Sequence, residues 1–222
     1  MRQIKRIFSW MLVLAVAISV GCSATAATAP KLTSKDRKVL EPIIGLFVDN
    51  TQNWGEKTGK REYHDFDIES SSASKVMADA SVYALYYHYL LPKQETWMKS
   101  VMAKMNGELV ETYTEKQVDQ MAVLLFGKKI PQHGKTRWKY KDGKYGITGD
   151  RGDAIDPRIK GQKPLSNGDI RLRVHEQTWE GDYDNSFDNG IQFYLVLHPN
   201  KNSVWGYTIQ KLTYISTKRT DQ

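Results

Sequence analysis

Residues 114–147, TEKQVDQMAVLLFGKKIPQHGKTRWKYKDGKYGI, contain the point at which the hydrophobic pattern of the chain changes from the period of a helix to that of a strand. In the first part, apolar residues share one helical face: Val118, Met121, Ala122 and Leu125. Thr114 and Gln117 have the spacing of a capping box, and Gly127 follows where a helix C-cap belongs. These signals predict a helix over residues 114–126.

After Pro131 the same stretch reads as a β-hairpin. Asp142-Gly143 between two aromatic runs is a strong signal for a two-residue turn. A turn of this kind sets two cross-strand pairs on one face: Tyr140 with Tyr145, and Trp138 with Ile147.

The remaining C-terminal sequence predicts further antiparallel strands. One strand alternates core and solvent residues, with Ile170, Leu172 and Val174 on one side and Arg171, Arg173 and His175 on the other. Residues 191–197 are nearly all apolar, which indicates a central strand. After a turn at 199–203, residues 204–215 are rich in aromatic and β-branched side chains and return as the next strand.

Upstream of residue 114 the patterns are helical. Ser34 has the character of an N-cap, and Pro42 either starts or kinks the helix that follows. Apolar residues recur there at helical spacing: Val39, Ile43, Leu46, Phe47 and Trp54. Residues 71–91 form the clearest helix of the chain, and residues 96–106 form a shorter one.

The order of these elements indicates the fold class. Helices that precede strands in sequence are typical of an α+β fold. We expect a helical half at 34–130 packed on an antiparallel β half at 131–222, with 34–222 forming one compact unit.

The first residues have the pattern of a bacterial export signal. Three cations, Arg2, Lys5 and Arg6, precede an apolar run at 7–20 that is broken only by Ser9 and Ser19. This run is shorter than the ~20 residues needed to span a bilayer core. The pattern predicts an exported protein.

Two processing sites compete at the end of this signal. Ser19-Val20-Gly21-Cys22 resembles a lipobox, which predicts a signal peptide at 1–21, lipidation of Cys22 and a membrane-anchored protein of the cell envelope. Residues 22–33 are small and polar and would then serve as a flexible tether. Cleavage after residue 26, at Ala24-Thr25-Ala26, is the alternative and would give a soluble periplasmic or extracellular protein.

Composition narrows the function classes. The chain has 222 residues and a formal net charge of +7, of which the predicted signal carries three, leaving a mild +4. Its Lys and Arg residues are scattered, which argues against a nucleic-acid partner. Cys22 is the single cysteine, so an exported chain would be held together by packing without an internal disulfide.

Three stretches carry a resemblance to known proteins: 118–130, the hairpin at 140–145, and the closing strand at 206–215. In these, the chain resembles a group of uncharacterised secreted proteins and lipoproteins of bacteria. In that group a helix ending in Phe-Gly is followed by a Tyr-rich hairpin and a sheet of cystatin-like or NTF2-like type. The resemblance implies such an architecture and brings no site with it.

Candidate chemistry is sparse. The sequence has no G-x-S-x-G, H-E-x-x-H or P-loop motif, and no two of its five His residues have helical metal-ligand spacing. His175-Glu176, at the end of a strand, could be half of an acid/base or metal site, or part of a solvated strand face.

Two further clusters are candidates for binding. Asp182, Asp184 and Asp188 supply the oxygen ligands that calcium prefers, although Phe193 stands where an EF-hand loop needs an acid, and the residues also suit an ordinary turn. Tyr86 and Tyr89 lie off the core stripe of their helix, where they would stack on a ligand or fill the seam with the β half.

These observations favour a non-catalytic envelope lipoprotein or secreted binding module, without a cofactor. Its partners would be the membrane, through Cys22, and an envelope protein, a cell-wall component or a small molecule. One alternative is an envelope hydrolase or transferase that uses acids near His175 and the 180–188 loop. Another is an inhibitor or chaperone of an envelope protein, which would expose a large apolar patch.

Overall fold

The computed structural model describes residues 31–55, 60–86, 112–147, 155–179, 186–203 and 205–218. These residues form an α+β fold, as the sequence predicts. The helices are α2 (Ser34–Val48), α3 (Ala73–Tyr86) and α5 (Glu115–Phe126), and α2 runs into a short 3₁₀ turn, η1 (Asp49–Thr51).

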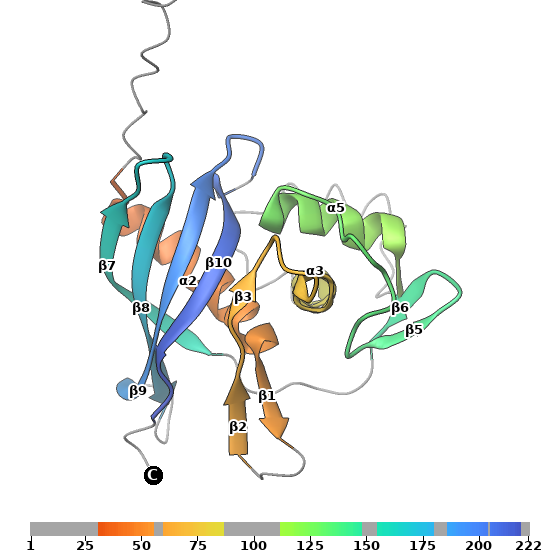
Figure 1. Ribbon diagram of the computed structural model, residues 1–222, viewed down its shortest axis with the longest axis horizontal. Helices are drawn as coiled ribbons and strands as arrows, with labels where there is room; N and C mark the ends of the chain where they lie inside the picture. The colour runs from red at the N-terminus through yellow and green to blue at the C-terminus, as the bar shows by residue number, and fades with distance from the viewer. Residues whose placement is uncertain are drawn as a thin grey trace, which may run out of the picture.

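The main sheet is antiparallel, with five strands in the order β3-β10-β9-β8-β7 (Figure 1). Its strands are β3 (Phe66–Asp67), β7 (Asp156–Pro164), β8 (Ile170–Trp179), β9 (Ser186–Pro199) and β10 (Tyr207–Ser216). The apolar run at 191–197 lies in β9, between β8 and β10, and its central position is confirmed.

Two smaller sheets flank the main one. β1 (Gln52–Gly55) pairs with β2 (Lys60–Tyr63), and β6 (Lys144–Gly146) pairs with both β4 (Thr112–Thr114) and β5 (Lys139–Lys141). The sequence predicts a helical half at 34–130, and the strands β1, β2, β3 and β4 within it were not predicted. β3 has only two residues and pairs with β10 at the other end of the chain, so no local periodicity in the sequence predicts it.

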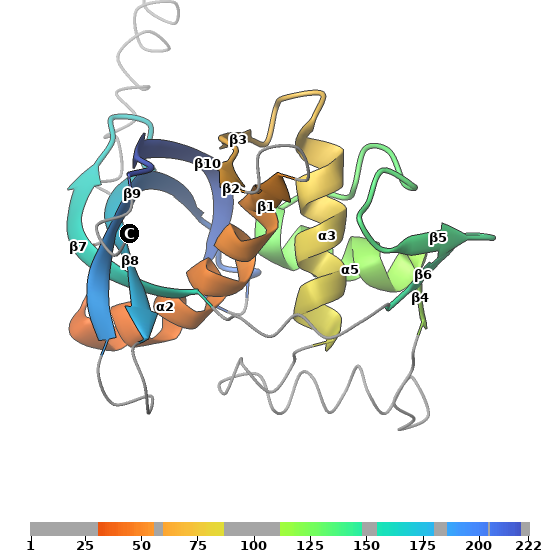
Figure 2. The ribbon, with the colours of Figure 1, turned by 90° about the horizontal axis from the view of Figure 1, so that it is seen from below.

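The core lies between the sheet and the helices. Figure 2 shows the main sheet curved, with α2 running along its concave side and α3 and α5 beyond the β10–β3 edge. Phe47 of α2 meets Phe66 of β3 and Phe126 of α5 in edge-on contacts, with ring centroids 5.2 and 5.9 Å apart. These three aromatic rings join the helices to the sheet.

The start of α2 differs from expectation. Thr33 is the N-cap, and its side chain forms a capping box with Asp36; Ser34 is the first helical residue. Leu32 is buried in the core, so the expected tether at 22–33 ends before it. Pro42 lies within α2, and Trp54, expected on this helix, belongs to β1.

The helix at the centre of the opening stretch is confirmed in detail. α5 covers Glu115–Phe126, Thr114 and Gln117 form the capping box, and Gly127 caps the C-terminus at φ 79°. The helix expected at 71–91 is described as α3 up to Tyr86, and the one expected at 96–106 lies outside the described residues.

The hairpin register is also confirmed. Tyr140 pairs with Tyr145, and Asp142 and Gly143 have φ of 50° and 70°, as a type I′ turn requires. The described ladder ends at Lys139 and Gly146, one pair short of the expected Trp138–Ile147 contact.

Replacing Gly143 by valine should lower the free energy of unfolding by about 1 kcal/mol or more, because a β-branched residue resists a positive φ. A Cβ at Gly143 would meet no atom within 4 Å, so the loss comes from backbone conformation rather than from a clash. Urea unfolding measures the effect. Asn tolerates this conformation, so Gly143→Asn should lose less, and equal losses in the two variants would contradict the turn assignment.

None of the described helices is long and apolar enough to cross a membrane. Cys22 and the expected signal peptide lie outside the described residues.

Candidate functional site

A cavity of about 670 Å³ lies between α2 and the beginning of β7, with Tyr83 of α3 at its side. This volume falls in the range of small-molecule sites in proteins. Part of the lining is apolar, from Pro42, Leu46, Tyr83, Ile155 and Pro157. The remaining side chains are charged: Lys38, Glu41, Asp49, Asp156 and Arg158. A mixed lining of this kind suits a ligand with an apolar body and a polar group.

The wall of the cavity depends on a close contact between α2 and β7. A Cβ at Gly45 would overlap the carbonyl oxygen of Ile155 and lie 3.0 Å from Cδ of Pro157. Only glycine therefore lets the start of β7 approach the helix this closely.

Two hydrogen bonds hold the same contact. The Ile159 amide donates to Oε1 of Glu41 over 2.9 Å, and Nη1 of Arg37 donates to the Ile159 carbonyl over 3.2 Å. Together they satisfy backbone groups that this edge strand would otherwise leave open, and they fix the cavity wall.

The charged groups of the cavity form a compact cluster. Nη1 of Arg158 lies 2.6 Å from Oδ1 of Asp156 and 3.7 Å from Oε2 of Glu41. The other carboxylate oxygen of Asp156, Oδ2, is buried and has no hydrogen-bond partner among the described residues. Burial raises the pKa of Asp156, and the negative charge of Glu41 adds to this, while Arg158 opposes it. Asp156 thus lines the cavity and keeps one buried oxygen without a donor among the described residues.

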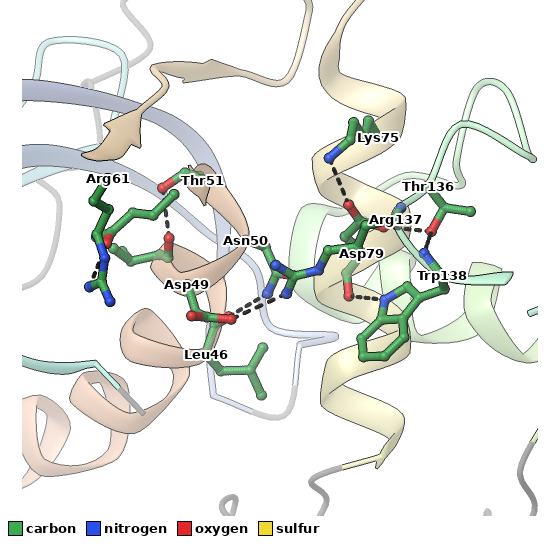
Figure 3. A network of polar contacts seen from close by, with 12 residues as sticks. Leu46, Asp49, Asn50, Thr51, Arg61, Lys75, Asp79, Thr136, Arg137 and Trp138 are labelled. Atoms are coloured by element: carbon green, nitrogen blue, oxygen red, sulfur yellow. Dashed lines mark hydrogen bonds and ion pairs between the residues drawn. The ribbon is translucent and has the colours of Figure 1, made fainter. Parts of the chain in front are cut away.

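Arg137 belongs to a polar network, drawn in Figure 3, and contacts two residues that line the cavity, Asp49 and Tyr83. Arg137 pairs with Asp49 over 3.2 Å and also donates to the side chain of Asn50. Its guanidinium lies 6.0 Å from the ring centroid of Tyr83. Asp49 and Tyr83 both face the cavity, so Arg137 braces its wall from behind.

Arg137 is itself positioned by Asp79, a completely buried residue of α3. Oδ1 of Asp79 accepts from the Arg137 amide over 2.8 Å and from the Thr136 hydroxyl over 2.5 Å. Oδ2 accepts from Lys75 over 3.1 Å. This carboxylate holds the loop that carries Arg137 against α3.

His175 and Glu176 do not form a joint site. Successive residues of a strand face opposite sides of the sheet. Glu176 points into the protein, where Gln52 and Asn189 each donate to it over 2.8 Å and Arg61 lies 3.8 Å away. His175 lies on the outer side, so the two side chains do not together form half of an acid/base or metal site, as the sequence suggested.

His175 instead pairs with Asp188 of β9. Its Nδ1 is hydrogen-bonded to Oδ2 of Asp188, and its Nε2 is buried without a hydrogen-bond partner among the described residues. Burial opposes ionisation of Asp188, but hydrogen bonds from His175 and the Gly190 amide and the charge of Lys160 outweigh it and lower its pKa. The carboxylate therefore orients the imidazole ring.

The other predicted site residues are placed only in part. Tyr86 is half-buried against the core at the described end of α3, and Tyr89 lies outside the described residues. Asp182 and Asp184 also lie outside them, so of the calcium candidates only Asp188 is described. Within the described ranges, no group of three or more His, Cys, Asp or Glu residues could hold a metal ion.

Sequence reasoning missed the cavity. Its one local signal was the presence of Pro42 and Gly45 in the C-terminal, apolar half of α2, because both residues are costly inside a helix. Such a costly pair indicates that another segment approaches the helix closely, but not which one.

Comparisons with known proteins add no relative: no family model matches the chain, and neither a curated protein nor a solved structure shows significant similarity to it.

Proposed function

We propose that this chain is an exported, non-catalytic binding module whose ligand occupies the cavity between α2 and β7. The observation that carries the proposal is the unpartnered, buried Oδ2 of Asp156 in the wall of a cavity of about 670 Å³ whose lining is partly apolar and partly charged. Buried polar atoms are nearly always paired, and an exception in a cavity is a reason to expect a ligand.

The lining suggests the chemistry of this ligand. Arg158 already holds one oxygen of Asp156, so a protonated amine or another strong donor would complete the second. Pro42, Leu46 and Tyr83 would take up an apolar body. The expected ligand is therefore a small amphipathic amine.

Dansylcadaverine, a fluorescent primary amine with an aromatic body, should bind the purified protein with an increase in fluorescence. Leu46→Trp fills the cavity and should abolish this binding. Asp156→Asn keeps the shape but removes the charge, and should weaken binding by about tenfold or more, because a hydrogen bond to a charged group is worth about 1.5–3 kcal/mol. Binding should also weaken as the pH falls and Asp156 becomes protonated.

Asp67→Asn is the matched control, since Asp67 pairs with Lys211 at the opposite edge of the sheet and lies outside the cavity lining. It should bind the probe like the wild type. Probe binding that survives both Leu46→Trp and Asp156→Asn would overturn the site.

Stability separates a binding role of Asp156 from a structural one. The folded state raises the pKa of Asp156, so the neutral carboxyl group favours the folded state. This stabilisation is complete below the pKa that Asp156 has in the unfolded chain, and it is lost as the pH rises through its pKa in the folded state. At pH 7 the wild type lacks this contribution, so Asp156→Asn should have an unchanged or higher midpoint of thermal unfolding. A lower midpoint would mean that this carboxylate serves the fold.

Export and anchoring belong to the same proposal. Mass spectrometry of the mature N-terminus should find Cys22 lipidated as the first residue. An unmodified chain that starts at Ala27 would replace the anchored form with a soluble secreted one and would leave the binding site untouched.

A hydrolase or transferase is the second candidate, and the His175–Asp188 pair is the observation that favours it. A carboxylate on Nδ1 with Nε2 unpaired is the arrangement of a general base. His175 is the cross-strand partner of Arg158, a cavity residue, but neither His175 nor Asp188 lines the cavity itself, and this favours binding over catalysis. An inhibitor or chaperone role has less support, because the large apolar side chains exposed in the described part of the chain, Val123 and Ile215, lie on different elements.

A further inference from the structure

The outer side of β7 and β8 is strongly cationic. Lys163 is the cross-strand partner of Arg171, and Arg173 follows on the same side of β8. Lys160 is exposed, and its charge acts on Asp188, which places it near the same surface. We call this set, Lys160, Lys163, Arg171 and Arg173, the basic face.

The charges of the basic face are not neutralised by neighbouring acids. Among the ion pairs of the described residues, none includes a member of this set. Asp188, on which the charge of Lys160 acts, is itself paired with His175. The described residues of this surface therefore carry a net positive charge that an anionic partner would complement.

Both arginines of the basic face are held in place by uncharged groups of β9. The guanidinium of Arg171 lies 4.6 Å from the ring centroid of Tyr194, and Nη2 of Arg173 donates to Oε1 of Gln192 over 2.8 Å. Both contacts order the side chains without cancelling their charge. Tyr194 adds an amphipathic ring of the kind that favours a membrane interface.

The chain enters the domain at the β7 edge of the sheet. α2 begins next to β7 in Figure 1, and Arg37 in its first turn donates to the Ile159 carbonyl of β7. Lys31, the first described residue, comes nine positions after Cys22, and nine residues reach at most about 32 Å. An anchored domain would thus be held with the β7 edge of its sheet near the bilayer.

We propose that the basic face docks on anionic lipid headgroups and orients the anchored domain on the membrane. The choice of a membrane over another polyanion rests on the proposed anchor, whereas the face itself is independent of the cavity. Each basic residue near an anionic surface contributes about 1 kcal/mol, or about fivefold in partition, and salt screens this attraction.

The test uses the chain from residue 27 onward, which contains every described element and lacks the lipidation site. Sedimentation with phosphatidylcholine vesicles should show little binding. Vesicles with about 40% phosphatidylglycerol have an anionic surface and should bind the protein. About 0.5 M salt should release it, because screening is already strong at roughly 0.15 M.

Lys163→Glu with Arg173→Glu should reduce partition into the anionic vesicles by at least about 25-fold, which is the loss of two fivefold contributions. Lys139→Glu with Lys141→Glu is the control. It makes the same change of charge on the exposed hairpin at the other end of the molecule, and should reduce partition by less than about fivefold.

Three results would overturn the docking surface. These are equal binding to neutral and anionic vesicles, equal losses in the two double variants, or binding to soluble polyglycerol phosphate without binding to vesicles. The last would assign the face to a cell-wall polymer. Dansylcadaverine binding by the Lys163→Glu, Arg173→Glu variant should be unchanged, so failure of this surface and failure of the cavity are distinguishable.

Discussion

Asp79→Ala should lower the free energy of unfolding by about 2–6 kcal/mol, because two donors lose their acceptor and each unsatisfied buried donor costs about 1–3 kcal/mol. Asp79 has no exposed surface and accepts hydrogen bonds from Lys75, Thr136 and the Arg137 amide. Without the carboxylate, the Thr136 hydroxyl and the Arg137 amide lose their acceptor in a site with little access to water. Urea unfolding, followed by circular dichroism, measures the change.

Two variants separate the contributions of this carboxylate. The Lys75 side chain is 44% exposed, so Lys75→Ala should cost less than about 1 kcal/mol, as is usual for exposed ion pairs. Asp79→Asn keeps an oxygen for Thr136 and the Arg137 amide and should fall between the two. If Asp79→Ala costs no more than Lys75→Ala, the carboxylate does not hold the loop that carries Arg137.

Asp79→Ala should also weaken ligand binding in the cavity. Arg137 braces Asp49 and Tyr83, and Asp79 fixes the backbone from which Arg137 extends. At temperatures where Asp79→Ala is still folded, dansylcadaverine should therefore bind it more weakly than it binds Lys75→Ala.

The features that the sequence predicted well are those with local signals. α5, with its capping box and Gly127, and the Asp142-Gly143 turn each depend on residues fewer than five positions apart. The alternation of β8 is equally local, because a strand buried on one side repeats every two residues.

The features that the sequence did not predict depend on distant contacts. Phe66 and Asp67 form a strand only because β10 lies beside them, and two residues carry no periodicity. Asp79 occupies a helix interior where a carboxylate is expected to be exposed, and its partners near residue 136 lie more than fifty positions away.

For the candidate site too, the local features were predicted and the distant contacts were not. His175 was correctly placed on the outer side of its strand, but its partner Asp188 comes from the neighbouring strand. Glu176 was paired with His175 because they are adjacent in sequence, and the alternation of the strand separates them. The cavity needed the approach of Pro157 to Gly45 over more than a hundred positions, which no periodicity encodes.

The close contact of Gly45 with the start of β7 leads to a second prediction with a large expected effect. Gly45→Ala should destabilise the fold by about 2 kcal/mol or more, although Ala in place of Gly inside a helix normally stabilises by about 1 kcal/mol. The added Cβ would overlap the Ile155 carbonyl oxygen, which belongs to the backbone and has no rotamer through which to move away. The start of β7 must therefore shift from α2.

Gly161→Ala is the matched control, because Gly161 lies at a bulge in the same strand and a Cβ there would come no closer than 3.8 Å to Cβ of Arg173. It should change stability by less than about 1 kcal/mol, since Ala mainly restricts the unfolded chain at a compatible site. Thermal unfolding compares the two variants.

The ligand assay adds a reading that stability alone does not give. A shift of β7 moves Ile155, Asp156 and Pro157 together, and these residues form one wall of the cavity. Gly45→Ala should therefore weaken dansylcadaverine binding by at least about tenfold, because misplacing Asp156 forfeits a charged hydrogen bond. Gly161→Ala should bind as the wild type does. A Gly45→Ala protein with wild-type stability and wild-type binding would mean that α2 and β7 are not in close contact, and the cavity between them would lose its basis.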